Sequence, residues 1–189
     1  MIEIKISGRG GQGVVLASQI LGAALFKTGL WIQAFPSFGA ERRGAPVSAF
    51  VRADPNEITL RCGVRRPDWG IILDPQLLED PALFGSMKKD GMILLNSSGW
   101  LKGLQRPEAE RIFVVDAFAI AHRLHLGSAS FPIVNSAMVG AFAKASGLIG
   151  LEGVIDAIQD LAPSEKDKNA ASAREAYERV KMLNTQEDT

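Results

Sequence analysis

The stretch Ile2–Val15, IEIKISGRGGQGVV, determines how the rest of the chain is organised. It begins with isoleucine at every second position, which is typical of a β-strand over residues 2–7. A glycine-rich loop over residues 8–13 follows, and residues 12–28 then place apolar side chains on one broad helical face. A strand that passes through a glycine loop into a helix start favours anions, because the loop and the first helical turn both present backbone N–H groups.

The glycine loop allows two interpretations. Its spacing, G-x-G-x-x-G, fits the dinucleotide-binding fingerprint in the strand–turn–helix order that the fingerprint requires. It fits equally a tight turn that packs a helix on a sheet without any ligand. Nicotinamide sites usually place an acidic residue at the end of the second strand. No acidic residue stands between Glu3 and Glu41, so the sequence argues against a nicotinamide site.

The composition describes an ordinary globular chain without net charge. Of its 189 residues, 21 are Lys or Arg and 21 are Asp or Glu. This balance, without a basic stripe, predicts no nucleic-acid partner and no acidic membrane surface. The sequence shows no signal peptide and no apolar run of about 18 residues, so we expect a cytoplasmic protein. The single cysteine, Cys62, cannot by itself hold zinc or an iron–sulfur cluster, and we interpret it as a structural or incidental strand residue.

Strands alternate with helices along the chain, which predicts an α/β fold of three layers around a mixed, mostly parallel sheet. The expected strands in this pattern cover residues 2–7, 30–35, 69–73, 92–95 and 112–115. We expect an antiparallel hairpin of residues 47–52 and 57–62, because Asp54-Pro55-Asn56 between them is strong turn chemistry. Helices are predicted at 117–126, from Asn135 or Ser136 onward, and at 151–161. Residues 2–161 then form one domain, and residues 162–189 add a partly exposed C-terminal helix over 164–183 and a frayed tail.

Polar residues gather where ligands of open α/β sheets bind, beyond the carboxyl ends of the strands. Besides the glycine loop, Asp74 and residues 96–98 follow predicted strands directly. The loop SFGAERRGAP, residues 37–46, should reach the same edge of the sheet. The sequence therefore predicts a ligand site at this edge.

Three arginines could give this edge a local positive charge. We expect Arg9, Arg42 and Arg43 to meet there, since guanidinium groups suit phosphate or carboxylate. The alternative is a solvated loop in which Glu41 pairs with a neighbouring arginine. Arg42 and Arg43 lie past Pro36 and away from the strand end, which argues against a role as an NADP 2′-phosphate site.

No catalytic residue and no metal ligand can be assigned from the sequence. It contains no Gly-x-Ser-x-Gly elbow. His122 and His125 share one face of a predicted helix, but Asp116 is the one carboxylate near them in sequence. We therefore interpret both histidines as surface or packing residues rather than as metal ligands.

Four longer segments are specific enough to compare with a known family. They are GRGGQGVVLASQILGAALF (residues 8–26), QAFPSFGAERRGAPVSAFVR (33–52), RPDWGIILDPQLLE (66–79) and VNSAMVGAFAKASGLIGLE (134–152). Together, in this order, they resemble the gamma subunit of the pyruvate/2-oxoacid:ferredoxin oxidoreductase family, over residues 2–160. The form FPSFGAERRGAP is most similar to the pyruvate branch.

The resemblance implies a subunit that is inactive alone. Such enzymes oxidatively decarboxylate a 2-oxoacid, here expected to be pyruvate, to acyl-CoA and CO2 and reduce ferredoxin. Thiamine diphosphate, Mg and the iron–sulfur clusters belong to the alpha, beta and delta subunits, so this chain alone would bind no cofactor. The family places the gamma unit against the thiamine-binding core, where it helps to enclose coenzyme A.

The same resemblance suggests which residues face the ligand. They would contact either the coenzyme A phosphates or the neighbouring subunit near the active site. The residues are Gly8, Arg9, Gly10, Gly11, Gln12, Gly13, Arg42 and Arg43.

Two other functions stay open at the level of sequence. One is a self-sufficient nucleotide-binding oxidoreductase, which would bind NAD(P)H as an isolated chain. The other is a non-catalytic assembly module whose glycine loop contacts only protein.

Overall fold

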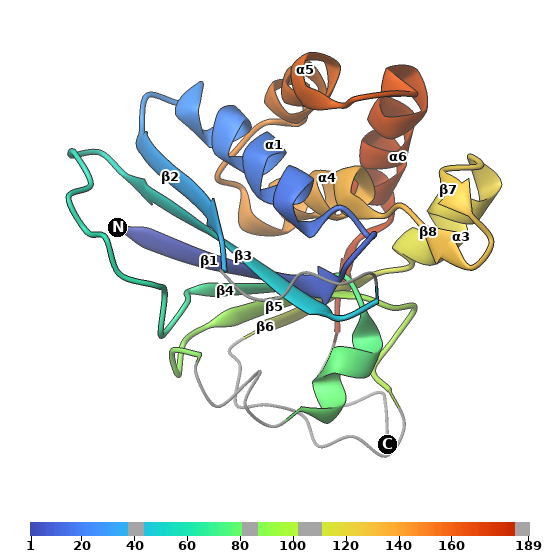
Figure 1. Ribbon diagram of the computed structural model, residues 1–189, viewed down its shortest axis with the longest axis horizontal. Coiled ribbons are helices and arrows are strands. Elements are labelled where there is room, and N and C mark those ends of the chain that lie inside the picture. Colours follow the sequence, from blue (N-terminus) through green and yellow to red (C-terminus); the bar gives the residue numbers. More distant parts are fainter. Residues whose placement is uncertain (38–43, 81–86, 102–110, 184–189) are drawn as a thin grey trace.

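The computed structural model describes residues 1–37, 44–80, 87–101 and 111–183 (Figure 1). Within these ranges a seven-stranded sheet has the order β2-β3-β1-β4-β5-β6-β9. Its strands are β1 (Ile2–Arg9), β2 (Trp31–Pro36), β3 (Pro46–Asp54), β4 (Trp69–Ile72), β5 (Met92–Asn96), β6 (Arg111–Val115) and β9 (Lys181–Met182).

The sheet is mixed, and most of its strands run in one direction. β1, β4, β5 and β6 are parallel neighbours. β3 lies between β1 and β2 and is antiparallel to both, so β2 shares the direction of β1. β9 runs against β6 at the other edge. The expected α/β fold with a mixed, mostly parallel sheet is confirmed.

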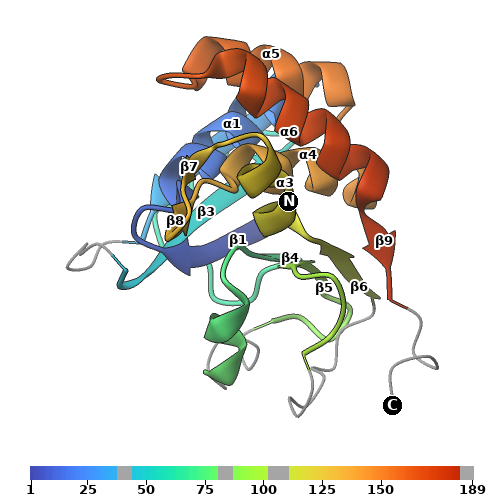
Figure 2. The ribbon, with the colours of Figure 1, turned by 90° about the vertical axis from the view of Figure 1, so that its right-hand side faces the viewer.

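Helices cover one face of this sheet in two tiers (Figures 1 and 2). α1 (Val14–Phe26) and α4 (Asn135–Ser146) pack on the strands, α5 (Leu151–Leu161) packs on α1, and α6 (Lys166–Arg179) packs on α4. The other face carries the short 3-10 helix η1 (Pro75–Glu79), whose Leu78 closes a smaller apolar cluster. After β6 come α3 (Ala117–Arg123) and a two-stranded hairpin of β7 (Gly127–Ser128) and β8 (Phe131–Pro132).

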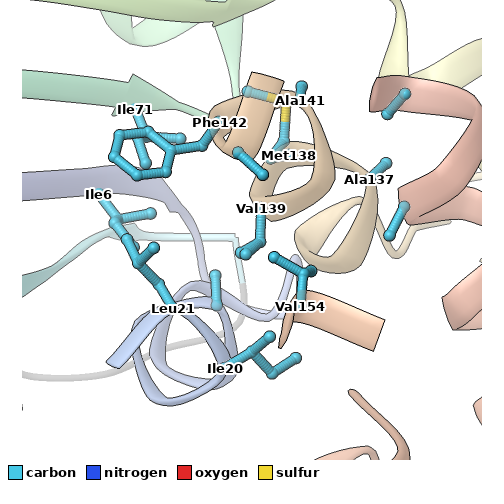
Figure 3. Close-up of a cluster of buried hydrophobic side chains, with 14 of the residues drawn as sticks. Ile6, Ile20, Leu21, Ile71, Ala137, Met138, Val139, Ala141, Phe142 and Val154 are labelled. Atoms are coloured by element: carbon cyan, nitrogen blue, oxygen red, sulfur yellow. The ribbon is translucent and has the colours of Figure 1, made fainter. Parts of the chain in front are cut away.

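The main core lies between the sheet and the inner helices, and Figure 3 shows its centre. Ile6 of β1, Leu21 of α1 and Phe142 of α4 are completely buried there. Phe142 also meets the Trp69 ring edge-on, with 5.1 Å between the ring centroids. The alternating isoleucines of β1 thus face the helices, and the glycine loop connects the carboxyl end of β1 to the start of α1.

The expected hairpin of residues 47–52 and 57–62 is wrong in its second half. β3 pairs with β2 and β1 instead, so both of its edges are already occupied. The turn after β3 does form, because the Asn56 N–H donates to Asp54 Oδ1 at 2.8 Å. Residues 57–62 then run as an irregular segment rather than as a strand. The antiparallel hairpin of this fold is β2–β3.

The C-terminal segment also differs from the expected helix over residues 164–183. The helix ends at Arg179, and Lys181–Met182 forms strand β9 at the edge of the sheet. α6 is more deeply packed than its many charges suggest, because it buries a face of small residues. Gly140 of α4 makes this close crossing possible, since a Cβ there would lie 2.2 Å from the Ala173 carbonyl oxygen.

Candidate functional site

A pocket of about 240 Å³ opens where the glycine loop, the turn after β4, the start of α3 and the β7–β8 hairpin meet. We call it the glycine-loop pocket. Its lining residues come from both halves of the sequence: Arg9, Gly10, Gln12, Gly44, Asp74, Pro75, Gln76, Phe118, Ser130, Phe131 and Pro132. The sequence predicted this edge of the sheet as the ligand side, and the structure brings the glycine loop and Asp74 together there.

The glycines of the loop serve packing and backbone conformation. A Cβ at Gly8 would lie 2.7 Å from Val14 Cγ2, so the start of α1 could not approach β1. Gly13 has a φ of +81°, and a Cβ there would lie 2.6 Å from Asn135 Nδ2. Gly11 has a φ of +103°, but nothing lies within 4 Å of the position that a Cβ would take. Gly11 is therefore required by its backbone conformation and not by a neighbouring side chain.

Several backbone groups of the loop are already used within the protein. The Arg9 N–H donates to Gln12 Oε1 at 2.8 Å, and the Gln12 N–H donates to the Arg9 carbonyl at 3.0 Å. The Gly10 N–H donates to the Ala45 carbonyl at 2.9 Å. A phosphate-binding loop needs several N–H groups aimed outward. Three N–H groups of this loop instead donate within the protein, which leaves fewer of them for a phosphate.

The side chain of Arg9 is held inside the pocket wall by three acceptors. Its Nε donates to Asp74 Oδ2 at 2.9 Å, its Nη1 to the Gly44 carbonyl at 3.2 Å and its Nη2 to Gln76 Oε1 at 3.3 Å. Asp74 also accepts from Gln12 Nε2 at 3.3 Å. The Arg9 charge is thereby balanced by a nearly buried carboxylate, and this part of the pocket is electrically neutral.

The predicted meeting of Arg9 with Arg42 and Arg43 cannot be followed, because residues 42 and 43 lie outside the described ranges. The nearest described residue, Gly44, is fixed to the glycine loop. Its N–H donates to the Gly10 carbonyl at 3.0 Å, and its own carbonyl accepts from Arg9. The arginine-containing loop, residues 37–46, is therefore joined at its end to the glycine loop.

The other polar strand end, at Asn96, has a structural role. Asn96 is completely buried; its Nδ2 donates to the Leu73 carbonyl, and its Oδ1 accepts from the Ala117 N–H, both at 2.8 Å. These bonds tie the end of β4 to the start of α3. They position the pocket but do not line it.

Sequence reasoning missed the apolar half of the pocket. Phe118 and Phe131 belong to α3 and the β7–β8 hairpin, about 110 residues or more from the glycine loop. Gln76 could have been found, because it directly follows the Asp74-Pro75 turn that the sequence marks. No local pattern marks the two phenylalanines, since their role depends on the return of the chain to this edge.

The remaining singled-out side chains lie on the surface. His122 and His125 are exposed, and Cys62 is exposed in the irregular segment 57–62 rather than in the expected strand. In the ranges that the structure describes, no group of three or more His, Cys, Asp or Glu side chains is arranged to hold a metal ion. None of the described helices has the length and apolar character needed to span a membrane.

Fold and site together define an α/β protein whose glycine loop is closed by its own hydrogen bonds beside a neutral, partly aromatic pocket. Residues 3–179 match the family described as pyruvate ferredoxin/flavodoxin oxidoreductase. The pyruvate synthase subunit PorC of Methanothermobacter marburgensis is 44% identical over 182 residues, which cover 96% of this chain and 98% of that protein. The pyruvate/ketoisovalerate oxidoreductases common subunit gamma of Pyrococcus abyssi is 43% identical over 188 residues, covering 97% and 99%.

Solved structures agree with this relationship. The pyruvate oxidoreductase subunit PORC of Thermotoga maritima superposes with a TM-score of 0.80 at 32% identity, covering 97% of this chain and 98% of that one. The 2-oxoglutarate:ferredoxin oxidoreductase of Magnetococcus marinus shares the fold, with a TM-score of 0.70 at 18% identity, over 94% of this chain and 30% of its own longer chain. The chain therefore belongs to the pyruvate ferredoxin/flavodoxin oxidoreductase family, in its gamma-subunit branch.

Proposed function

We propose that the chain works as the gamma subunit of a 2-oxoacid:ferredoxin oxidoreductase, with pyruvate as the most suitable substrate. In this function it joins alpha, beta and delta subunits that oxidatively decarboxylate the 2-oxoacid to acyl-CoA and CO2 and pass electrons to ferredoxin. The observation that carries the proposal is the match to PorC and gamma subunits over nearly the whole of both chains.

The redox chemistry would belong to the partner subunits. Iron–sulfur clusters are held by several cysteine thiolates, and this sequence contains one cysteine. The pocket residues described above offer an ion pair, amides and aromatic rings, with no nucleophile and no base arranged for catalysis. The contribution of this chain is thus to bind, to position and to exclude water beside an active site that other subunits complete.

For coenzyme A, the glycine-loop pocket suits the neutral pantetheine arm better than the phosphates. Phe118, Phe131 and Pro132 offer apolar contact, and Gln76 offers amide groups, while the Arg9 charge is balanced by Asp74. The arm of coenzyme A is uncharged and carries amides, so it matches such a lining. The phosphates would then be bound by Arg42 and Arg43 of the adjoining loop.

The first experiment tests assembly and turnover. The chain is co-expressed with alpha, beta and delta subunits, and the purified complex is assayed for pyruvate-dependent, coenzyme A-dependent reduction of ferredoxin. We expect turnover by the complex and none by the isolated chain. The proposal would be overturned if the chain purified without these subunits. It would also be overturned if the isolated chain bound NAD(P)H with micromolar or tighter affinity.

The second experiment separates a ligand role of the arginine-containing loop from a purely structural one. In the assembled complex, Arg42→Ala with Arg43→Ala should raise the KM for coenzyme A by roughly tenfold, since one lost ionic contact is worth about 1–2 kcal/mol. The matched control is Arg174→Ala, which removes an exposed arginine of α6 that pairs with Glu152. An unchanged KM together with weaker assembly would show that the loop contacts protein and not coenzyme A.

A further inference from the structure

A second pocket borders the edge strand β2 and shares no lining residue with the glycine-loop pocket. No described strand pairs with the outer side of β2. The pocket has a volume of about 440 Å³, and its lining consists of Ile32–Phe35, Arg52 of β3 and Leu60–Cys62. Four consecutive strand residues point alternately to the two faces, so a pocket that touches all four runs along the strand and reaches its backbone. We call it the edge pocket.

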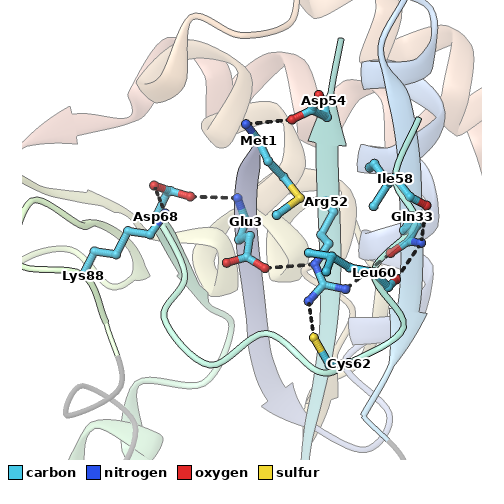
Figure 4. Close-up of polar contacts among 10 residues, drawn as sticks. All are labelled: Met1, Glu3, Gln33, Arg52, Asp54, Ile58, Leu60, Cys62, Asp68 and Lys88. Atoms are coloured by element: carbon cyan, nitrogen blue, oxygen red, sulfur yellow. Dashed lines mark hydrogen bonds and ion pairs between the residues drawn. The ribbon is translucent and has the colours of Figure 1, made fainter. Parts of the chain in front are cut away.

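The wall of the edge pocket is preformed by Gln33 and the buried Arg52 (Figure 4). Gln33 Nε2 donates to the carbonyls of Ile58 at 3.1 Å and Leu60 at 3.0 Å, which holds the irregular segment beside β2. Arg52, only 1% exposed, donates to Gln33 Oε1 at 3.3 Å and to Cys62 Sγ at 3.9 Å. The pocket is therefore built into the fold and does not need a ligand to form.

The charge of Arg52 is used internally, so it is not what a ligand would meet. Its Nε pairs with Glu3 Oε1 at 2.9 Å, and its guanidinium lies 5.5 Å from the centre of the Phe35 ring. The buried cation therefore stabilises the floor of the edge pocket. The charge that a ligand would meet must come from the rim.

The rim of the edge pocket carries a positive charge. Arg61 lines the pocket and is exposed. It forms no ion pair or hydrogen bond with any part of the chain that the structure describes. β2 itself, WIQAFP, carries no charge. An uncompensated arginine beside this uncharged strand favours a negatively charged group on the occupant.

The backbone of β2 indicates that the occupant is an extended polypeptide. An open strand edge presents N–H donors and C=O acceptors in alternation, which an extended polypeptide satisfies and a phosphate group does not. Uncharged open edges are also hazardous for a soluble protein, and proteins usually protect them with charges or cover them. Trp31 and Leu60, 53% and 43% exposed, add apolar surface at the same edge.

We propose that the edge pocket binds an extended segment of a partner subunit, which adds to β2 as a further strand and places a carboxylate against Arg61. This proposal rests on the proposed function, because it needs a complex with other subunits. It assigns the contact to a surface distinct from the glycine-loop pocket, at the β2 edge of the sheet.

The test compares the isolated chain with the purified complex by two measurements. Backbone hydrogen exchange over residues 31–36 should slow at least tenfold in the complex, since new interstrand bonds protect the β2 amides. Alkylation of Cys62 by iodoacetamide should slow by a similar factor, because this single, exposed thiol lines the edge pocket. A complex that forms while both rates stay unchanged would overturn the inference and leave the proposed function intact.

Charge variants provide the second arm of the test. Arg61→Glu should weaken subunit binding at least tenfold, and the loss should be smaller at high salt. Arg61→Lys should retain binding, because it keeps the charge. The matched control is Lys181→Glu, a charge reversal on β9 at the other edge of the sheet. Unweakened binding of the glutamate variant also overturns the inference, whereas a wild-type chain that binds no subunit overturns the proposed function itself.

Discussion

Gly13 shows how a single glycine in a ligand-like motif can be required by packing. Its φ of +81° is accessible mainly to glycine, and its Cα lies against the Asn135 side chain at the start of α4. The sequence predicts a helix from Asn135 or Ser136 onward, and α4 begins at Asn135, with Val134 at its N-cap position and no side-chain cap bond. The buried amide instead fills the space that Gly13 leaves, so the loop and α4 are matched to each other.

A pair of alanine substitutions separates the cost of a positive φ from the cost of the close contact with Asn135. Gly13→Ala should lower the free energy of unfolding by about 2–4 kcal/mol, because it combines a positive φ with a close contact to Asn135. Gly11→Ala, with a positive φ but open space, should cost about 1–2 kcal/mol. Urea unfolding monitored by circular dichroism measures both. Equal costs would show that Asn135 moves away without penalty.

At the scale of elements, the crossing of α4 and α6 holds the C-terminal segment on the domain. The two helices approach so closely at Gly140 and Ala173 that no side chain fits between their backbones. α6 carries many charges on its outer side, and Arg174 pairs there with Glu152 of α5 at 2.7 Å. This exposed pair lowers the pKa of the Glu152 carboxyl through its hydrogen bond with Arg174. The tight crossing, rather than the surface ion pair, positions α6.

Alanine substitutions at two helical glycines should change the stability of the protein in opposite directions. Glycine to alanine in a helix usually stabilises by about 0.5–1 kcal/mol, and Gly153→Ala in α5 should do so because nothing lies within 4 Å of the new Cβ. Gly140→Ala should instead destabilise by about 2 kcal/mol or more, because its Cβ would meet the backbone of α6. Thermal unfolding of the two variants checks this. Stabilisation by Gly140→Ala would mean that α6 can move away at little cost.

At the scale of the whole molecule, the chain closes its sheet with its own C-terminal segment. β9 pairs with β6, and the Leu183 N–H donates to the Ile112 carbonyl at 2.8 Å. Without α6 and β9, the small-residue face of α4 and the edge of β6 would both be open to solvent. The C-terminal segment therefore completes the core and covers the edge of β6, so that the described sheet ends in β2 (Trp31–Pro36) on one side and in the two-residue strand β9 on the other.

Truncation tests this role directly. A chain that ends at Pro163 should lose cooperative unfolding and bind a hydrophobic dye, because it exposes the α4 face and the β6 edge. A chain that ends at Leu183 keeps every contact described above and should unfold like the full chain. A cooperative, dye-free truncation at Pro163 would show that residues 164–189 are a dispensable addition to the domain.

Local patterns predicted those parts of the fold in which residues close in sequence determine the structure. The alternation of Ile2, Ile4 and Ile6 indicated β1, and the apolar runs around Ile71, Leu94 and Val114 indicated β4, β5 and β6. α5 was predicted with its observed bounds, because its apolar face has a clear helical period. The strand pairs of β3 and the presence of β9 could not be found this way, since partners far away in the sequence decide them.

The same distinction between local and long-range determinants applies to the candidate site. The sequence alone determined the fold class, the glycine loop at the end of β1 and, through four long segments, the family, and it predicted the edge of the sheet at which the glycine-loop pocket opens. Only the tertiary structure decided what the loop does with its polar groups. Asp74, 65 residues from Arg9, balances the charge that the sequence offers to an anion, while Gln12 and Ala45 accept the N–H groups of the loop. The physical reason is that a hydrogen bond or an ion pair depends on atoms within about 3 Å, and the chain brings such atoms together only after it has folded.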